Sequence, residues 1–204
     1  MQTNNQIFLR GRLAALPTLS HVNHSVEYFL LPLTARRLSG AEDRLNVIAS
    51  QEQLAALSLE EGSPLTVRGE VRTFNNRSGV GSRLVVSVFA RELSQEEGDD
   101  ENMLSLSGTL CKPPSLRATP LGRTICDMIL AINRRYGRAD YLPCIAWGSL
   151  AYRCAAMKVG DRLALEGRLQ SRVYTKEVDG QLQERTAFEV SVMSLSDPEE
   201  DYLD

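Results

Sequence analysis

Residues 165–176 read LEGRLQSRVYTK, and residues 67–76 read VRGEVRTFNN, a weaker copy of the same pattern. Both stretches have the character of β-strands, and each contains one glycine, Gly167 or Gly69. Strand interiors rarely contain glycine, so this residue indicates a sharp bend, as is needed to close a small barrel. The chain therefore carries the same barrel-forming strand twice.

The correspondence extends along the chain at a nearly constant offset. Gly62 and Gly160 are 98 residues apart, and Asp43 and Asp140 are 97 apart. The offset increases slightly toward the end, which places the extra length in one hairpin of the second copy. A fixed period of this kind predicts a tandem duplication.

The distribution of charge supports the same division of the chain. We expect domains over residues 1–95 and 102–196, joined by the acidic linker EEGDDE (96–101) and followed by the acidic tail DPEEDYLD (197–204). The formal net charge is −3 for the whole chain, but the first domain carries +2 and the second +5. Both predicted domains are therefore basic, which allows a polyanionic ligand.

The second copy shows the order of elements most clearly. The stretches MLSLSGTLCK (103–112) and TICDMILAINRR (124–135) alternate apolar and polar residues, as half-buried strands do. Between them, KPPSLRATPLGR contains proline and glycine, which break regular structure. A third strand, ADYLPCIA (139–146), precedes a helix at 148–160 that ends at Gly160. A long hairpin with an Asp-Gly turn at 179–180 completes the copy.

Five strands with a helix between the third and fourth form the order of an oligonucleotide/oligosaccharide-binding (OB) barrel. The first copy has the same order, with a helix at 50–62 and a capping box formed by Ser50 and Gln53. The predicted fold class is therefore all-β, with two tandem OB-fold, five-stranded Greek-key barrels.

Aromatic and basic residues gather on the strand ends and loops of the second copy. Small barrels hold single strands by stacking bases on aromatic rings while a basic groove follows the phosphates. The aromatic candidates are Tyr136, Tyr141, Trp147 and Tyr174. The basic candidates are Arg117, Arg134, Arg135, Arg138, Arg172 and Lys176.

These residues resemble the bacterial single-stranded DNA-binding proteins. GTLCKPPSLRATPLGR is similar to the first strand and loop of that family, CDMILAINRRY to the second strand, DYLPCIAWG to the third and VGDRLALEGRLQSRVYT to the fourth. The resemblance covers nearly all of residues 103–195. It implies that four aromatic positions stack bases, and these fall on Tyr136, Tyr141, Trp147 and Tyr174.

The first copy lacks all four stacking residues at the matching positions. Arg44 replaces Tyr141, Ser50 replaces Trp147, Asn76 replaces Tyr174, and the position of Tyr136 falls near Leu38. We therefore expect the first barrel to serve assembly or spacing. The resemblance also implies four barrels per assembly, so a tandem chain would form a homodimer.

Members of the resembling family commonly end in an acidic tail with a terminal Pro-Phe that docks replication and repair proteins. The end of this chain is acidic but finishes in Asp204, which argues against docking of such partners. An alternative role for the tail is to occupy the protein's own basic groove.

Other functional classes have weaker support. His21 and His24 form an HxxH, but two ligands make a poor metal site, and no nucleotide-binding loop or catalytic triad is recognisable, so we expect neither an enzyme nor a cofactor. An OB-fold protein-interaction scaffold, or a primosome or plasmid accessory protein, are the alternatives. The absence of a ~20-residue apolar run and of a secretory signal predicts a cytoplasmic protein that acts at the nucleoid and not at membranes. The four cysteines contain no CxxC pair and are expected as buried apolar residues.

Overall fold

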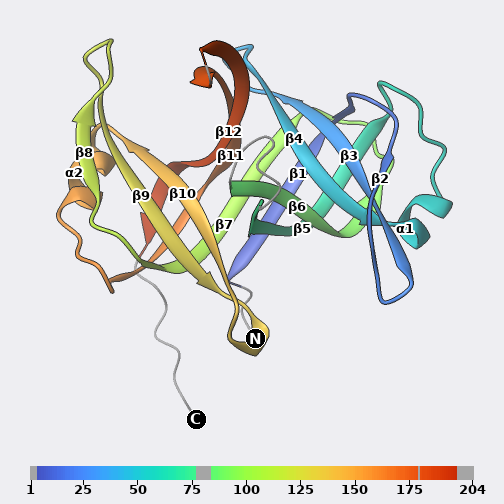
Figure 1. Ribbon diagram of the computed structural model, residues 1–204, viewed down its shortest axis with the longest axis horizontal. Helices are drawn as coiled ribbons and strands as arrows, with labels where there is room; N and C mark the ends of the chain where they lie inside the picture. The colour runs from blue at the N-terminus through green and yellow to red at the C-terminus, as the bar shows by residue number, and fades with distance from the viewer. Residues whose placement is uncertain (1–3, 77–83, 179, 197–204) are drawn as a thin grey trace. The chain divides into compact units, whose positions relative to one another are not determined.

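The chain folds mainly as β-strands (Figure 1). The structure is a computed structural model that describes residues 4–76, 84–178 and 180–196. Contacts divide these residues into two units. One consists of residues 6–103 with 169–188, and we call it the first-barrel unit. The other consists of residues 4–5, 104–168 and 189–196, and we call it the second-barrel unit.

Antiparallel pairing closes the first barrel. Its elements are β1 (Asn5–Leu13), β2 (Thr18–Asn23), β3 (Val26–Arg36), β4 (Glu42–Ser50), α1 (Gln51–Ala55), β5 (Pro64–Asn75) and β6 (Leu84–Ser94). Strand β1 pairs with both β3 and β5, β3 pairs with β4, and β5 pairs with β6. A short parallel pairing of β4 with β6 completes the ring. Leu9, Leu31 and Leu45 fill its centre and are fully buried.

The second barrel repeats this arrangement. Its elements are β7 (Glu101–Leu110), β8 (Ser115–Ala118), β9 (Thr124–Asn133), the 3-10 turn η1 (Arg135–Gly137), β10 (Ala139–Trp147), α2 (Ser149–Ala155), β11 (Arg162–Val178) and β12 (Gln181–Ser196). Strand β7 pairs with β9 and β11, β9 with β10, and β10 runs parallel to β12. The order of strands and the parallel closing pair confirm the prediction of tandem OB-folds.

The structure adds one short strand to each copy. The prediction that KPPSLRATPLGR lacks regular structure was wrong for Ser115–Ala118, which pairs with β9 as β8. The two prolines at 113–114 precede this strand, so the paired residues keep their backbone donors. In the first copy β2 occupies the same place beside β3. His21 therefore lies in a strand and not in a loop.

Both helices are shorter than predicted. They span 51–55 and 149–155, compared with the predicted 50–62 and 148–160. The predicted capping box is confirmed, because the Ser50 hydroxyl accepts from Gln53 N and the Gln53 side chain accepts from Ser50 N at 2.9 Å. Gly160 lies after α2, in the turn before β11, with φ +97. Its N–H donates to Leu110 O at 2.9 Å, so this glycine serves the strand entry and does not end the helix.

The interior glycine of each barrel-forming strand allows two strands to approach closely. A Cβ built on Gly167 would lie 2.3 Å from Ser191 O, and one on Gly69 would lie 2.2 Å from Phe89 O. The ladder between β5 and β6 also shifts register between Arg68 and Gly69. The predicted bend therefore coincides with a place where no side chain fits.

We expect Gly167→Ala to lower the free energy of unfolding of the second barrel by about 3 kcal/mol, since backbone would have to move to admit the methyl group. Urea unfolding of the full chain measures this change. Gly122→Ala is the matched control, because Gly122 has φ +75 and open space where a Cβ would lie. This variant should lose only about 1 kcal/mol of unfolding free energy, the cost of a left-handed backbone at alanine. Equal losses for the two variants would contradict the steric explanation.

None of the helices in the described residues is long and apolar enough to span a membrane.

Candidate nucleic-acid interface

Strand β10 displays two aromatic rings on the outer face of the second barrel. Leu142, Cys144 and Ala146 point into the core and are at most 2% exposed. Tyr141 and Trp147 lie on the opposite face, with 51% and 37% of their surface exposed. The two-residue period of a strand explains this separation, because an even spacing of six residues returns both rings to the same side. The interface thus begins with two rings on one rigid strand.

Tyr136 lies in the loop between β9 and β10. Its side chain is 96% exposed, and its backbone adopts φ 62 and ψ 35, a left-handed conformation that is unusual outside glycine. The loop is closed below it by Arg134 N, which donates to Arg138 O at 2.7 Å. Left-handed non-glycine residues persist where the surrounding structure enforces them and often lie at functional sites. The loop therefore holds a phenol ring out in solvent.

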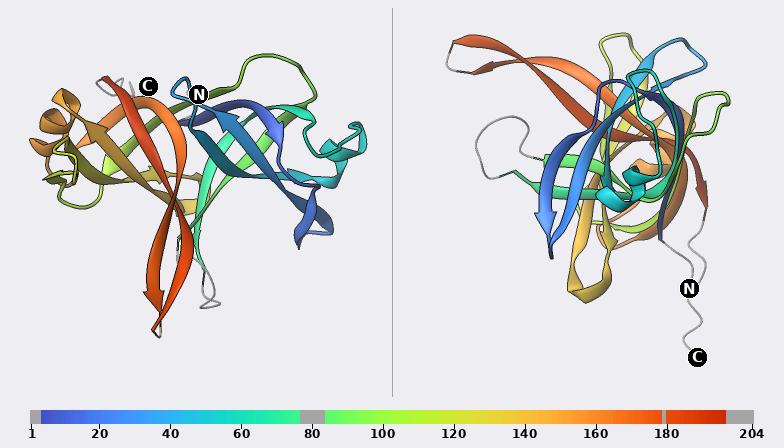
Figure 2. Two further views of the ribbon diagram at one scale, coloured as in Figure 1. Left: turned by 90° about the horizontal axis from the view of Figure 1, so that it is seen from above. Right: turned by 90° about the vertical axis from the view of Figure 1, so that its right-hand side faces the viewer.

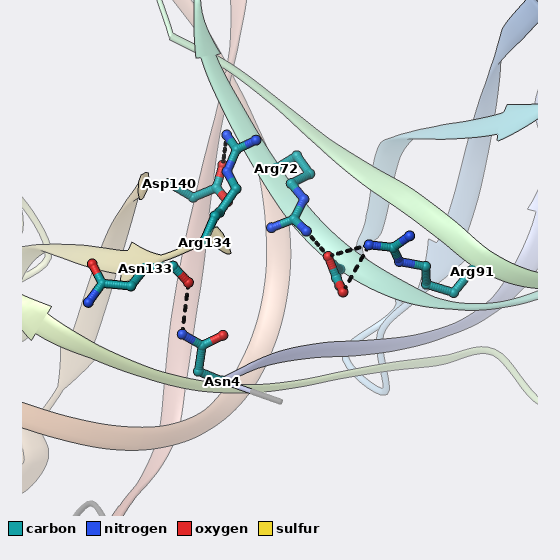
Figure 3. A network of polar contacts seen from close by, with 7 residues as sticks. Asn4, Arg72, Arg91, Asn133, Arg134 and Asp140 are labelled. Atoms are coloured by element: carbon teal, nitrogen blue, oxygen red, sulfur yellow. Dashed lines mark hydrogen bonds and ion pairs between the residues drawn. The ribbon is translucent and has the colours of Figure 1, made fainter. Parts of the chain in front are cut away.

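A buried ion pair anchors this loop (Figure 3). Arg134 Nη2 lies 2.6 Å from Asp140 Oδ1, and the Asp140 side chain has no exposed surface. Asn4 adds a second contact on the same side of the unit by donating from Nδ2 to Asn133 O at 2.9 Å. The sequence suggested Arg134 as a phosphate ligand, and in the structure its guanidinium binds Asp140.

The remaining arginines of this loop are exposed. Within the described part of the chain, the guanidinium groups of Arg135 and Arg138 have no ion-pair partner. They lie on either side of the Tyr136–Gly137 pair in the chain. Both are therefore available to phosphate groups beside an exposed ring.

Arg117 lies in the same cross-strand row as Trp147. Arg117 of β8 is opposite Ile125 of β9, which is opposite Trp147 of β10, so the two residues lie roughly 10 Å apart across the sheet. Arg117 Nη2 donates to Asp127 Oδ1 at 3.2 Å. Hydrogen bonding to this carboxylate raises the pKa of Arg117. A phosphate at this point would have to replace a carboxylate that the guanidinium already binds.

Three of the candidate residues lie on the distal part of β11, which belongs to the first-barrel unit by its contacts. Tyr174 is half-buried, and Arg172 Cζ lies 5.6 Å from the centre of its ring, within the range of a cation–π contact. Arg172 and Lys176 are exposed. Figure 2 shows the β11–β12 hairpin as a long two-stranded ribbon in orange to red. The structure therefore divides the candidates between the two units.

Strand registers align the two copies residue by residue. Arg44 is opposite Thr34 as Tyr141 is opposite Ala131, and Ser50 is opposite Tyr28 as Trp147 is opposite Ile125. The loop contact between Arg37 N and Ala41 O, at 2.8 Å, repeats the contact between Arg134 and Arg138. This alignment places Ser39, next to the exposed Leu38, at the position of Tyr136. The first barrel thus carries Arg44, Ser50 and Ser39 where the second carries its three rings.

The first barrel nevertheless has an aromatic cluster that the sequence analysis missed. The rings of His21 and Tyr28 stack with centroids 4.9 Å apart and planes 9° from parallel. Tyr28 also lies 5.6 Å from Phe89, whose ring is covered by Arg91 at 5.4 Å. Arg91 and Arg72 both bind Glu70 (Figure 3). In the sequence, Tyr28 could have indicated this cluster, because it lies opposite His21 in the β2–β3 hairpin.

The described histidine and cysteine side chains were candidates for a metal site or a reactive thiol. Among the described residues, no three His, Cys, Asp or Glu side chains come close enough together to hold a metal ion. Cys144 and Cys154 are buried, and burial raises the pKa of the Cys154 thiol to about 11. These thiols are therefore protonated at neutral pH and serve as small apolar side chains.

Known proteins share this architecture. The profile described as "Single-strand binding protein family" matches residues 101–196. The chain is 26% identical to a single-stranded DNA-binding protein of Thermus thermophilus over 201 residues, which covers 84% of this chain and 76% of the relative. It is 35% identical to single-stranded DNA-binding protein A of Bacillus subtilis over 83 residues, or 37% of this chain and 48% of the relative.

A solved structure resembles both barrels together. The crystal structure of the wild-type single-stranded DNA binding protein from Thermus aquaticus matches with a TM-score of 0.73 and 26% sequence identity. The match covers 98% of this chain and 95% of that one. A chain with two such barrels therefore has a counterpart in a solved protein.

Proposed function

Because residues 101–196 match the single-strand binding protein family, we propose that the chain binds single-stranded DNA irrespective of base order, with Tyr136, Tyr141, Trp147 and Tyr174 as the stacking rings. The observation that supports this most is the exposure of Tyr141 and Trp147 on the outer face of β10, next to a loop that holds Tyr136 in solvent. Stacking uses ring faces that every base possesses, so such a surface binds without reading sequence.

The cations around these rings would contact the phosphates. Arg135 and Arg138 flank Tyr136 in the chain, Arg117 shares a strand row with Trp147, and Arg172 and Lys176 flank Tyr174. Arg134 is assigned a different task in this proposal, since its contact with the buried Asp140 keeps the Tyr136 loop in place. The excess positive charge of residues 102–196 supplies the electrostatic attraction.

The protein is a binding protein and not an enzyme, as are the proteins of the family that residues 101–196 match. Protection of exposed strands in replication, recombination or repair is the role that follows. The proposal places it in the cytoplasm, where it would act on the DNA of the nucleoid.

The first barrel is proposed as an assembly and spacing module, with the two repeats taken as residues 1–95 and 102–196 around the linker at 96–101. Pairing of two chains would bring four barrels together. The proposed acidic tail, residues 197–204, lies outside the described residues.

Titration of the full chain with an oligo-dT measures the proposed activity through Trp147, the sole tryptophan. We expect Trp147 fluorescence to fall on binding, because stacking places a base against the indole ring. With five phosphate contacts, the slope of log K against log salt should be about −3.5, so affinity should fall about 100-fold from 50 to 200 mM salt.

The scaffold alternative predicts the opposite behaviour. A protein-binding surface made of the same residues would leave the fluorescence unchanged and give no shift of the oligonucleotide in a gel. Salt-independent affinity would also contradict the proposed role of the arginines. Titration with an oligonucleotide of mixed sequence is the control for independence from base order.

A further inference from the structure

Asp43 of β4 is a buried carboxylate with two kinds of partner. Its side chain is 1% exposed, and Arg37 binds it through Nε at 2.8 Å and Nη2 at 2.5 Å. Its Oδ1 also accepts a hydrogen bond from the backbone N of Ser171 at 2.8 Å. Ser171 lies in β11, within the hairpin segment of the first-barrel unit. The ion pair thus also holds the backbone of a strand that is 128 residues distant in the chain.

The next residue of β4 makes a second contact with the same serine. Arg44 donates from its backbone N to Ser171 Oγ at 2.9 Å. Leu169, two residues before Ser171, is bound by the side chain of Asn102. Asn102 Nδ2 donates to Leu169 O at 2.6 Å, and Leu169 N donates to Asn102 Oδ1 at 3.1 Å. The start of the hairpin segment is therefore held by hydrogen bonds at Leu169 and at Ser171, which are two residues apart.

A long two-stranded ribbon needs such support. Isolated hairpins are marginally stable in water, and β11 and β12 extend well past the barrel core. Tyr174 lies three residues beyond Ser171, about 10 Å along an extended strand. Fastening Ser171 restricts the positions that the Tyr174 ring adopts before a ligand arrives, and a preorganised group binds more tightly than a mobile one.

We propose that Asp43 and Arg44 of the first barrel act as a clamp on Ser171 that positions the β11–β12 hairpin, and with it Tyr174, for single-stranded DNA. Asp43 is a positioning residue in this proposal, because it reaches the ligand only through the hairpin. The inference rests on the proposed stacking role of Tyr174. It gives the first barrel a part in binding although its own strands lack the rings of the second.

The clamp itself is tested without DNA. Hydrogen exchange of the full chain measures the exchange rate of the Ser171 amide in Asp43→Asn and that of the Arg44 amide in Ser171→Ala. We expect each amide to exchange about ten-fold faster in its variant, because each loses or weakens its acceptor. Glu42→Gln is the matched control, since it removes one negative charge next to Asp43 from an exposed pair with Arg36 at 3.0 Å and should change neither amide. Unchanged exchange in both variants would overturn the clamp.

Its effect on binding is measured by a double-mutant cycle with labelled oligo-dT. Ser171→Ala should weaken binding about five-fold, the usual weight of one hydrogen bond, and Ser171→Thr should restore it by keeping the hydroxyl. In a Tyr174→Ala background the same Ser171→Ala change should have no further effect, whereas in a Tyr136→Ala background it should still cost five-fold. Full additivity with Tyr174→Ala would overturn the positioning role.

Comparing Tyr174→Ala with Ser171→Ala distinguishes a failure of the clamp from a failure of the proposed stacking role. If Tyr174→Ala alone leaves affinity unchanged, the stacking role of that ring is wrong, and the positioning role falls with it even where exchange shows an intact clamp. If Tyr174→Ala weakens binding while Ser171→Ala does not, the proposed function stands and the clamp fails. Should Asp43→Asn not fold, the Ser171→Ala and Ser171→Thr pair still decides, because it leaves the Arg37–Asp43 pair intact.

Discussion

Replacing Tyr136, Tyr141, Trp147 and Tyr174 together by alanine is expected to lower the affinity for an oligo-dT by about 10³-fold or more. Each base stacked on an aromatic ring contributes about 1–3 kcal/mol, so four rings contribute at least about 4 kcal/mol. Because the variant lacks Trp147, fluorescence anisotropy of a labelled oligonucleotide is the appropriate measurement. Each ring alone should account for a loss of about 5- to 150-fold.

The matched control keeps the ring faces and removes only the hydroxyl groups. A Tyr136→Phe, Tyr141→Phe, Tyr174→Phe variant with Trp147 intact should bind almost as tightly as the natural chain, since stacking does not use the hydroxyl. Far-UV circular dichroism of the alanine variant should show an intact barrel, because three of the four rings are exposed. Native affinity in the alanine variant would refute the assignment of these rings.

Arg134→Ala is expected to lower the free energy of unfolding by about 3–5 kcal/mol. The change removes the guanidinium that lies 2.6 Å from Asp140, whose side chain is fully buried, and removing one partner of a buried ion pair is strongly destabilising. Urea unfolding of the full chain measures the effect. Affinity for an oligo-dT should also fall, because the loop that carries Tyr136 loses its anchor.

Two further variants test whether burial is the cause of this loss. Replacing both Arg134 and Asp140 by leucine should recover most of the stability, since no charge is then left in the core. Arg36→Ala removes an exposed pair with Glu42 and should cost less than about 1 kcal/mol. An equal cost for Arg134→Ala and Arg36→Ala would contradict the anchoring role of the buried pair.

Much of the fold could be predicted from the sequence because a strand buries every second residue. That period identified β7 and β9. The glycines at 69 and 167 marked interruptions of the barrel-forming strands, and the Ser50–Gln53 capping box marked a helix start. These features depend on a few neighbouring residues, so local pattern suffices to find them.

The short strands β2 and β8 were missed for the same reason. Proline and glycine around Ser115–Ala118 indicate a loop by local preference, but pairing with β9 overrides that preference. The helices ended earlier than their composition indicated, at residues 55 and 155. Tertiary pairing decided the outcome wherever the local signal was weak.

The sequence by itself determined the duplicated barrels and the order of their main strands, because alternation and repeat period are properties of the chain. Only the tertiary structure decided the partners. The ion pair between Arg134 and Asp140 and the stacking of His21 on Tyr28 are seen only there. The same holds for the hydrogen bond from Ser171 to Asp43, which lies 128 residues away in the chain. Such contacts depend on strand register and on which segments fold against one another, and neither is specified by any short stretch of residues.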